Sequence, residues 1–460
     1  MSLFNTLATG ASGLGASSTN LSVIGDNIAN IGTNGYKSSS ANFADTFPNS
    51  VNGLGGPNRI GTGTGLGEVA TDFGQGSLKS TSSAIDVAIL GNGFFQVASG
   101  DEMYYTRDGS FHLDANGYVV NSAGLRLQGY EATEGTVTST VGDLRIDASG
   151  VPQQATETIV LDATLSADQS TYIDETTGLP DNNPFDTLRT AQPLDGTATN
   201  APSMEQLSQA ADFATSVTVY DSLGLPHDVT IFFERDSASP DTWNTYAVVD
   251  GSQVDTNGDG VADGDAGYGF EIGSGSVQFD TNGDLVASSG IPINAGWTFP
   301  GSEPFTATFD FGLDPAGNPS EGGLRTNGTS SYVSTVSQDG YSAGVLDSVN
   351  VAQDGTIYGR YTNGQEQALG QVALATFASN AGLDRVGGNL YRATDASGDP
   401  ALGMAGVGGR GTTNGYSLES SNVELEDQFV DMIAAQRMYQ ANTGVIRTAD
   451  EALQQLIQLV

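Results

Sequence analysis

The sequence predicts a mainly β protein with α-helical ends, in which nested β domains lie between the two terminal helices. Two patterns predict this fold. Apolar residues recur every seven positions at both ends of the chain, as in helices that pair as a coiled coil. Between the ends, glycine is abundant, with 62 glycines in 460 residues, and many of them follow Asn or Asp. Such pairs are typical of short strands joined by tight turns.

Residues 1–31 are predicted to form the N-terminal coiled-coil helix. Most of its side chains are small, which lets a partner helix approach closely, although each glycine lowers the helix propensity by about 1 kcal/mol. We therefore expect this helix to be marginal alone in water. Residues 32–75 are predicted to be an extended connector. The apolar stripe of the helix consists of Leu7, Leu14, Leu21 and Ile28.

Residues 421–460 are predicted to form the C-terminal coiled-coil helix. Ser421 and Glu424 match the capping box that starts many helices. The two terminal stripes together are the predicted assembly seam, although the pattern is equally compatible with an intramolecular hairpin that stabilises a monomer. The stripe of the second helix consists of Leu425, Met432, Tyr439, Ile446, Leu453 and Val460.

The middle of the chain is predicted to hold two nested β regions. Residues 76–145 and 330–420 share alternating apolar residues and hairpin turns such as Asn92–Gly93 and Asp354–Gly355. We expect these two segments to complete one inner β domain. Residues 146–329, which differ in texture, are expected to be an inserted outer β domain or pair of domains.

The charge of the chain excludes several classes of function. It has 54 acidic and 15 basic residues, and a formal net charge of −39. Nucleic-acid binding requires a basic surface, and so does adhesion to anionic membranes. No stretch approaches the ~20 apolar residues of a membrane span, so no membrane insertion is expected. Acidic subunits repel one another, so their packing in an assembly should tighten with salt.

The absence of cysteine excludes disulfides, thiolate metal sites and cysteine nucleophiles. The first basic residue is Lys37, whereas a secretory signal begins with Lys or Arg before a compact apolar core. If the protein is exported, we therefore expect a route that leaves this end uncut.

One segment matches a catalytic motif. Gly340–Gly344 reads G-x-S-x-G, the nucleophile elbow of α/β-hydrolases, which needs a following helix and a later histidine. The only histidines, His112 and His227, precede Ser342, and the residues after it are predicted to be strands. The chain also lacks zinc and phosphate-loop motifs. We therefore predict no catalytic residues, no bound cofactor and no enzymatic activity.

A second segment resembles the start of a calcium loop. The closing position, where a bidentate Glu is expected, is Ala266, and no flanking helices are evident. A solvated Asp/Gly turn explains the segment equally well, so no metal site is predicted and calcium binding stays open. The candidate ligands would be Asp255, Asn257, Asp259 and Asp263.

Three stretches resemble the rod and hook proteins of the bacterial flagellum, and they occur in the order found in that family. They cover the two ends and the inner β domain, whereas residues 146–329 have no match that we can name. The stretches are Asn27–Asn30 with Thr33–Lys37, Asp86–Ile89 with Gly91–Phe95, and Asn422–Leu425 with Met432–Ile433 and Gln436–Tyr439.

Within this family the sequence is most similar to the hook members, because rod members usually lack a large insertion. The resemblance implies a structural subunit of the flagellar hook, which polymerises into a flexible hollow tube and acts as a universal joint between rod and filament. It also implies an extracellular location and export through the flagellar type III apparatus. The implied partners are further copies of the chain, the distal rod protein, the hook cap and the hook–filament junction protein.

Two alternatives remain at this stage. A distal rod subunit would have nearly the same ends but would form a straight, rigid tube, so the curvature of the polymer distinguishes it. A secreted calcium-stabilised adhesin or enzyme is compatible with the middle region alone, and a calcium-dependent melting temperature would support it.

Overall fold

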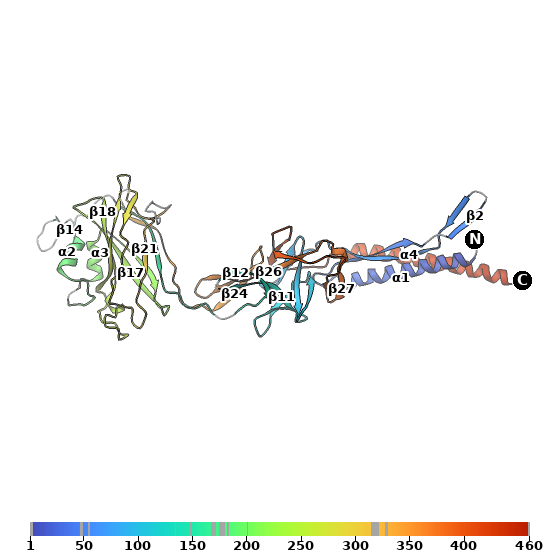
Figure 1. Cartoon of the computed structure of the whole chain (residues 1–460), viewed down its shortest axis with the longest axis horizontal. Helices are drawn as coiled ribbons and strands as arrows, with labels where there is room; N and C mark the ends of the chain where they lie inside the picture. Colours follow the sequence, from blue (N-terminus) through green and yellow to red (C-terminus); the bar gives the residue numbers. More distant parts are fainter. Residues whose placement is uncertain are drawn as a thin grey trace. The chain divides into compact units, whose positions relative to one another are not determined.

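The computed structural model describes residues 3–46, 49–53, 56–133, 135–147, 150–166, 172–173, 180–181, 184–199, 201–313, 322–326 and 330–458. The chain divides into two compact units, which are coloured by sequence in Figure 1. The inner unit combines Met1–Ser149 with Leu346–Val460, and the outer unit is Gly150–Val345. Each unit has its own hydrophobic core, and the outer unit is inserted in the sequence of the inner one. The nested β domains predicted from the sequence are therefore confirmed.

The two terminal helices pair along their length, as the fold prediction requires. Helix α1 spans Leu3–Ala29 and helix α4 spans Leu425–Gln458. They lie side by side in Figure 1 and make the most extensive contact between any two elements of the described chain. They are antiparallel, because Asn27 near the end of α1 contacts Gln428 near the start of α4.

Helix α4 begins later than the capping box at Ser421 predicts. The hydroxyl of Ser421 accepts a hydrogen bond from the backbone N–H of Val423, 3.3 Å away, and residues 421–424 are not helical. Asn422 holds this segment against the connector. Its Oδ1 accepts from the N–H of Ser38 at 2.7 Å, and its Nδ2 donates to the carbonyl of Asp72 at 2.9 Å. These bonds compete with helix formation, so the helix starts at Leu425.

The segment predicted to be an extended connector is a hairpin of paired strands. Strand β1 (Ser39–Asp45) pairs with β4 (Thr64–Thr71), and β2 (Asn49–Gly53) pairs with β3 (Gly56–Ile60). The β1–β4 hairpin packs against α1, where the N–H of Thr64 donates to Ser12 Oγ at 3.2 Å. The sequence gives little sign of these strands because most of their side chains are small or polar on both faces.

The inner β domain is built around a large sheet with the main order β24-β25-β26-β11-β7-β8-β28-β27. Strand β26 pairs with both β7 and β11, so the two chain segments of the inner unit share one sheet. The strands are β5 (Leu78–Ser80), β6 (Val87–Leu90), β7 (Phe94–Ser99), β8 (Glu102–Thr106), β9 (Phe111–Leu113), β10 (Val119–Asn121), β11 (Arg126–Thr133), β12 (Thr136–Asp143), β24 (Leu346–Val351), β25 (Thr356–Tyr361), β26 (Glu366–Thr376), β27 (Asp384–Gly387), β28 (Leu390–Arg392), β29 (Ala401–Met404), β30 (Thr412–Gly415) and β31 (Ser417–Glu419), with a 3₁₀ turn, η2, at Asn380–Gly382.

The outer unit packs two sheets against each other. One is the antiparallel sheet β16-β17-β18-β19-β20, and the other joins β13 to β21, β22 and β23. Apolar residues such as Leu161 of β13 and Ile231 of β17 meet in the core between them. The strands are β13 (Thr158–Leu165), β14 (Tyr172–Ile173), β15 (Pro180–Asp181), β16 (Phe213–Tyr220), β17 (Pro226–Arg235), β18 (Thr242–Asp250), β19 (Gly269–Phe279), β20 (Leu285–Ser288), β21 (Thr308–Asp310), β22 (Arg325–Thr326) and β23 (Tyr332–Gln338), with a 3₁₀ turn, η1, at Gly251–Gln253.

Two short helices in the outer unit differ from the all-β insertion that the sequence predicts. Helix α2 spans Pro184–Ala191 and α3 spans Met204–Ala210. They form a second, smaller core in which Phe185 and Leu207 pack with Phe232 of β17 and Tyr246 of β18. Ser203 and Gln206 form a complete capping box at the start of α3, which is the sequence signal that could have located this helix.

Candidate functional site

Small residues of α1 and α4 lie where the two helices approach each other most closely. A Cβ atom added to Gly10 would lie 2.9 Å from Cγ1 of Ile446, so the Ile446 side chain occupies the space that a larger residue at Gly10 would need. On α4, Ala435 and Ala449 are 0% and 6% exposed at the same interface region. We call this contact the small-residue seam, and it consists of Gly10, Gly13, Ser17, Ala435, Asn442 and Ala449.

Two polar contacts fix the register of the helix pair. Asn442 Nδ2 donates to Ser17 Oγ at 3.4 Å, and Asn27 Nδ2 donates to Gln428 Oε1 at 3.0 Å. A polar pair in a helix interface specifies register, because sliding would leave a partly buried amide without its partner. The helices are therefore held in one antiparallel alignment.

The predicted heptad residues flank the small-residue seam. Leu425 and Tyr439 are 41% and 43% exposed, and Val460 lies outside the residues that the structure describes. A helix pair that approaches this closely must place its small residues at the centre, and these also recur every seven positions. That second repeat is the signal which the sequence reasoning missed. The remaining heptad residues are half-buried: Leu7, Leu14, Leu21, Ile28, Met432, Ile446 and Leu453.

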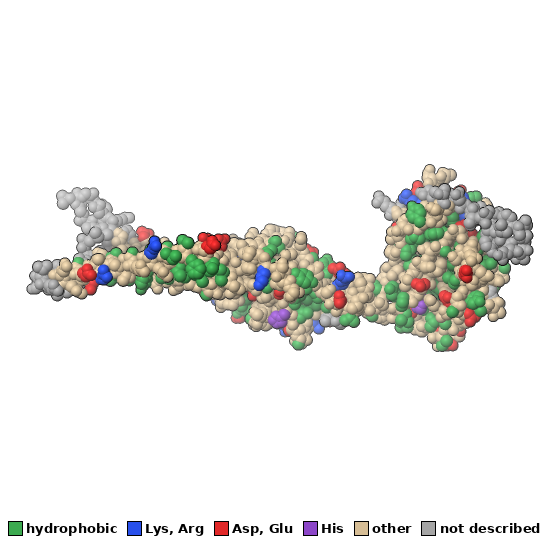
Figure 2. All heavy atoms as spheres, turned by 180° about the vertical axis from the view of Figure 1, so that it is seen from behind, with side chains coloured by type: hydrophobic (Ala, Val, Ile, Leu, Met, Phe, Trp, Pro, Cys, Tyr) green, Lys and Arg blue, Asp and Glu red, His purple; other side chains and the backbone are tan. Residues whose placement is uncertain are grey.

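Helix α4 leaves large apolar side chains uncovered on the inner unit. Leu425, Phe429 and Ile433 follow one another at four-residue spacing, which places them in one row along the helix. Figure 2 shows hydrophobic side chains gathered over the helical part of this unit. An exposed apolar patch of this kind marks an interaction surface. We call it the α4 patch, and its members are Leu425, Phe429, Val430, Ile433, Met438, Tyr439 and Val445.

A cavity of about 380 Å³ lies between the two terminal helices and the β1–β4 hairpin. Gly13 and Ala16 line it from α1, Phe43 from β1, and Met438 from α4. The inner unit thus has both exposed apolar side chains and a hollow beside them.

The G-x-S-x-G segment is not a nucleophile elbow. Tyr341 and Gly344 form isolated bridges with Gln154 and Val151, and strand β24 follows the segment where the motif requires a helix. His227 Nε2 lies 3.1 Å from Asp221 Oδ2, and its ring stacks on Phe299 with the centroids 3.7 Å apart. Both histidine contacts belong to the outer-unit fold. The segment therefore lacks the local structure that activates a serine.

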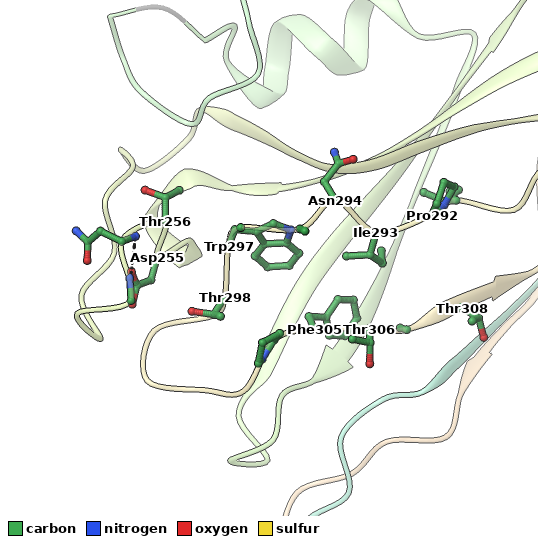
Figure 3. Close-up of a pocket in the computed structure, with 17 residues that line it drawn as sticks. Asp255, Thr256, Pro292, Ile293, Asn294, Trp297, Thr298, Phe305, Thr306 and Thr308 are labelled. Atoms are coloured by element: carbon green, nitrogen blue, oxygen red, sulfur yellow. Dashed lines mark hydrogen bonds between the residues drawn. The ribbon is translucent and has the colours of Figure 1, made fainter.

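A cavity of about 650 Å³ lies in the outer unit beside the calcium-like loop (Figure 3). Ile293, Trp297 and Phe305 give it an apolar wall, and Asp255 lies at its edge. Asp255 is only 2% exposed. Its carboxylate accepts hydrogen bonds from the backbone N–H groups of Asn257, Gly258 and Gly260, at 3.1, 2.6 and 2.8 Å.

The other candidate calcium ligands also bond within the loop. Asp263 Oδ2 accepts from the hydroxyl and the N–H of Thr256, and these bonds hold the pKa of Asp263 below its usual value. Asp259 Oδ1 accepts from the N–H of Val261 at 2.9 Å. The carboxylates of this loop therefore accept the hydrogen bonds that stabilise its turn. Among the residues that the structure describes, no group of three or more His, Cys, Asp or Glu side chains is placed to hold a metal ion.

The described helices include none that is long and apolar enough to cross a membrane.

Four family models match the chain, at both ends and in both compact units. Flagella basal body rod protein matches residues 7–37, and the Flagellar hook protein FlgE/F/G D1 domain matches residues 88–161. The Flagellar basal body protein FlaE D2 domain matches residues 187–341 in the outer unit. The Flagellar basal body rod FlgEFG protein C-terminal model matches residues 414–459.

Curated relatives and a solved structure agree with these models. The flagellar hook protein FlgE of Escherichia coli K12 is 36% identical over 97% of this chain and 98% of the relative, and that of Treponema pallidum is 31% identical over 99% and 100%. The crystal structure of Helicobacter pylori flagellar hook protein FlgE2 has a similar fold, with a TM-score of 0.51 and 14% identity over 74% of this chain and 100% of that chain. The chain therefore belongs to the flagellar hook protein FlgE family.

Proposed function

We propose that this chain polymerises through its terminal helices into a flexible hollow tube, which passes torque from the flagellar rod to the filament. Membership of the FlgE family makes the chain a structural subunit of the flagellar hook rather than an enzyme. The proposal concerns how the subunit assembles and which residues form the contact between copies.

The α4 patch is the observation that carries this proposal. Phe429 is 47% exposed, Val430 66% and Ile433 52%, although all three are large apolar residues on one helix. Fully burying a side chain of this kind is worth about 1.5–3 kcal/mol. A second copy that covers the patch would supply this energy. A contact that joins this patch to a different surface of the neighbouring copy does not close on itself, and it extends into a helical polymer.

The proposed assembly seam combines the α4 patch with the flanking heptad residues. Met432 and Ile446 of α4 and Leu14 and Leu21 of α1 are half-buried in the single chain, so part of each side chain remains available to a neighbour. In the polymer, the small-residue seam then holds α1 against α4 of the same subunit, and the exposed parts of the larger apolar residues hold the subunits to one another.

The charge of the chain supports flexibility. With 54 acidic and 15 basic residues, neighbouring copies repel one another over most of their surface. Contacts opposed by this repulsion are weak and exchangeable, which favours a tube that bends as it turns. Salt screens the repulsion, so polymerisation should require or be enhanced by high ionic strength.

Family membership also supports the finer assignments of partner and location. We propose that the polymer joins the distal rod protein at one end and the hook–filament junction protein at the other, and that it grows beneath the hook cap. Export through the flagellar type III apparatus and an extracellular position belong to the same proposal.

Electron microscopy of the purified protein in polymerising salt tests the function. We expect long tubes with variable curvature from the wild type and from Ser122→Asp, which adds a charge at an exposed turn of the inner unit, away from α4 in the sequence. Phe429→Asp places the same charge in the α4 patch and should abolish the tubes. Straight, rigid tubes would favour a distal rod subunit, and tubes from Phe429→Asp would show that the patch is not the contact.

A further inference from the structure

Three segments that are distant in sequence meet at a buried ionic cluster in the inner unit. Lys37 follows α1, Arg107 follows strand β8, and Glu419 ends β31 just before α4. The side chains of Lys37 and Glu419 are 0% exposed, and that of Arg107 is 3% exposed. The cluster lies where the chain passes between the terminal helices and the β domain, and we call it the joint.

The carboxylate of Glu419 is the centre of the joint. Its Oε1 accepts hydrogen bonds from Lys37 Nζ at 2.6 Å and from the N–H of Gly76 at 2.8 Å. Its Oε2 accepts from Arg107 Nη1 at 3.3 Å. Lys37 Nζ also donates to the carbonyl of Gly74 at 2.7 Å. One side chain thus ties both ends of the connector to the β domain.

The backbone around the joint is packed too closely to slide. The N–H of Gly35 donates to the carbonyl of Glu419 at 2.7 Å. A Cβ atom on Gly35 would collide with the backbone nitrogen of Asp108, and Gly35 has φ +67°. Only glycine fits this position, because other residues would need both the space and the left-handed conformation.

A second set of contacts holds the same turn from the opposite direction. The guanidinium of Arg385, in β27, lies 4.6 Å from the centroid of the Tyr36 ring. The Tyr36 hydroxyl donates to Asp26 Oδ2 at 3.0 Å, near the end of α1. Asn389 Nδ2 donates to the carbonyl of Asn34 at 2.8 Å. The exit of α1 is therefore fixed by directional bonds on two sides.

Stability alone does not explain the buried ionic cluster. It buries two cations with one carboxylate, and within the described chain Arg107 Nε has no hydrogen-bond partner. Burial lowers the pKa of both Lys37 and Arg107, which shows that taking these charges from water is costly. Apolar residues of similar volume often give equal or greater stability. Contacts between apolar residues are not directional, however, because apolar surfaces can slide and rotate while they remain in contact.

We propose that Lys37, Arg107 and Glu419 are positioning residues that fix the direction in which the α1–α4 pair leaves the inner β domain, and that they thereby set the helical twist of the polymer. The part that concerns the polymer rests on the proposed function above. A rotation of the helix pair breaks several charge-assisted bonds at once and leaves buried charges unpaired. The joint therefore holds the α1–α4 pair in one orientation relative to the inner β domain, and bending of the tube is left to the contacts between copies.

Two variants test whether the joint sets the orientation of the α1–α4 pair or only neutralises buried charges. Glu419→Asp keeps the charge but withdraws the carboxylate by about 1.5 Å, the length of one carbon–carbon bond. The triple variant Lys37→Met, Arg107→Met, Glu419→Leu removes all three charges and keeps an apolar core. The matched control is Asp384→Asn, which breaks the exposed ion pair between Asp384 and Arg392 of the same unit.

Amide exchange of the full-length free subunit tests the joint without a polymer. The N–H groups of Gly35 and Gly76 should be protected in the wild type and in the control, because Glu419 accepts both. In Glu419→Asp we expect exchange at least about tenfold faster at Gly76, as local opening becomes easier. Unchanged exchange at Gly76 in this variant would overturn the proposal, whether or not the protein polymerises.

Electron microscopy of the polymers tests the consequence for assembly. Wild type and Asp384→Asn should share one helical twist, whereas Glu419→Asp and the triple variant should give a different twist or poorly ordered tubes. A triple variant with the wild-type twist would refute a positioning role even if Glu419→Asp failed to fold. If the wild type itself formed no tube, the proposed function would fail, and Gly76 exchange would still decide whether the joint is held by Glu419.

Discussion

Gly13 of α1 lies directly against the side-chain amide of Asn442 of α4, with no room for a methyl group between them. A Cβ atom at Gly13 would lie 2.8 Å from Asn442 Nδ2, and the same amide donates to Ser17. The terminal helices can therefore pair this closely only because residue 13 is a glycine, which has no side chain. Gly15, two residues further along the same helix, has nothing within 4 Å of such a Cβ atom.

This difference gives a matched pair of substitutions. Gly13→Leu should force the helices apart at a cost of about 1–3 kcal/mol, as overpacking usually does. Since about 1.4 kcal/mol corresponds to a tenfold change in an equilibrium constant, the critical concentration for polymerisation should rise about tenfold or more. Gly15→Leu should gain helix propensity and should not raise it. Equal critical concentrations for the two variants would contradict the close approach at Gly13.

Met432→Asp should abolish polymerisation while the β domains remain folded. Met432 is a half-buried heptad residue of α4, and an aspartate there would place an unpaired charge in the proposed assembly seam. Sedimentation measures the polymer, and near-ultraviolet circular dichroism measures the packing of the β domains. Ser122→Asp, which adds the same charge at an exposed turn of the inner unit, should polymerise normally. Normal polymer from Met432→Asp would remove that residue from the seam.

The terminal helices should be ordered mainly in the polymer. The small-residue seam buries little apolar surface, and isolated helices that bury their stripe poorly are marginal in water. We expect fast amide exchange at Leu14 and Met432 in the free subunit and slow exchange in the polymer. Leu374, in the core of the inner sheet, should be protected in both states. Strong protection at Leu14 in the free subunit would refute coupled ordering.

Glu234 should make the outer unit less stable as pH rises. It is 0% exposed, and its Oε1 accepts from the N–H of Phe185 at the start of α2, 2.8 Å away. Burial raises the pKa of Glu234 from 4.5 to about 7, opposed by hydrogen bonds from the backbone of Asp186 and Phe185. The neighbouring carboxylates of Asp186 and Asp212 raise it further.

The stability of the outer unit should fall with rising pH because folding raises the pKa of Glu234. The folded chain holds this proton more tightly than the unfolded chain, so the stabilising contribution is complete below about pH 4.5 and is lost as pH rises through about 7. The full difference is on the order of 3 kcal/mol. We expect the outer-unit melting temperature to fall between pH 5 and pH 8, and Glu234→Gln to reduce that fall. The exposed control Glu303→Gln should leave it unchanged, and equal slopes in both variants would exclude Glu234 as the cause.

Calcium should not stabilise the outer unit. The oxygens of Asp255 accept three backbone N–H groups, so a cation would have to displace the bonds that form the turn. We expect the same melting temperature in EDTA and in about 1 mM calcium, a concentration that saturates many extracellular calcium modules. Asp255→Asn should lower the melting temperature in both conditions. A rise of several degrees with calcium would show that the loop opens to bind the ion.

Local patterns in the sequence were sufficient for much of the fold. The seven-residue spacing located both terminal helices, and Asp354–Gly355 lies between β24 and β25 as a hairpin turn, with φ +85° at the glycine. Such signals are local, because a turn or a helix face depends on neighbouring residues. The short helix α2 has only 8 residues, too few for a periodic pattern to stand out.

Local sequence patterns could not predict the contacts that organise the site. Lys37 and Glu419 lie 382 positions apart, and nothing local indicates that they form an ion pair. The α1–α4 contact shows a different limit. Its large residues drew attention because apolar repeats usually mark the buried stripe, whereas close approach places Gly13 and Ala435 at the centre. Which of two interleaved repeats faces the partner is decided by the distance between the helices, which the sequence does not state.

The chain enters and leaves the outer unit through adjacent backbone segments. Val151 bridges Gly344, and Gln154 bridges Tyr341. A domain whose two ends meet in this way can be inserted as one piece, because the rest of the chain needs to supply only two neighbouring attachment points. Lineages can therefore replace or enlarge this module while inheriting the polymer-forming parts intact, and an engineer can graft a foreign domain at the same two points.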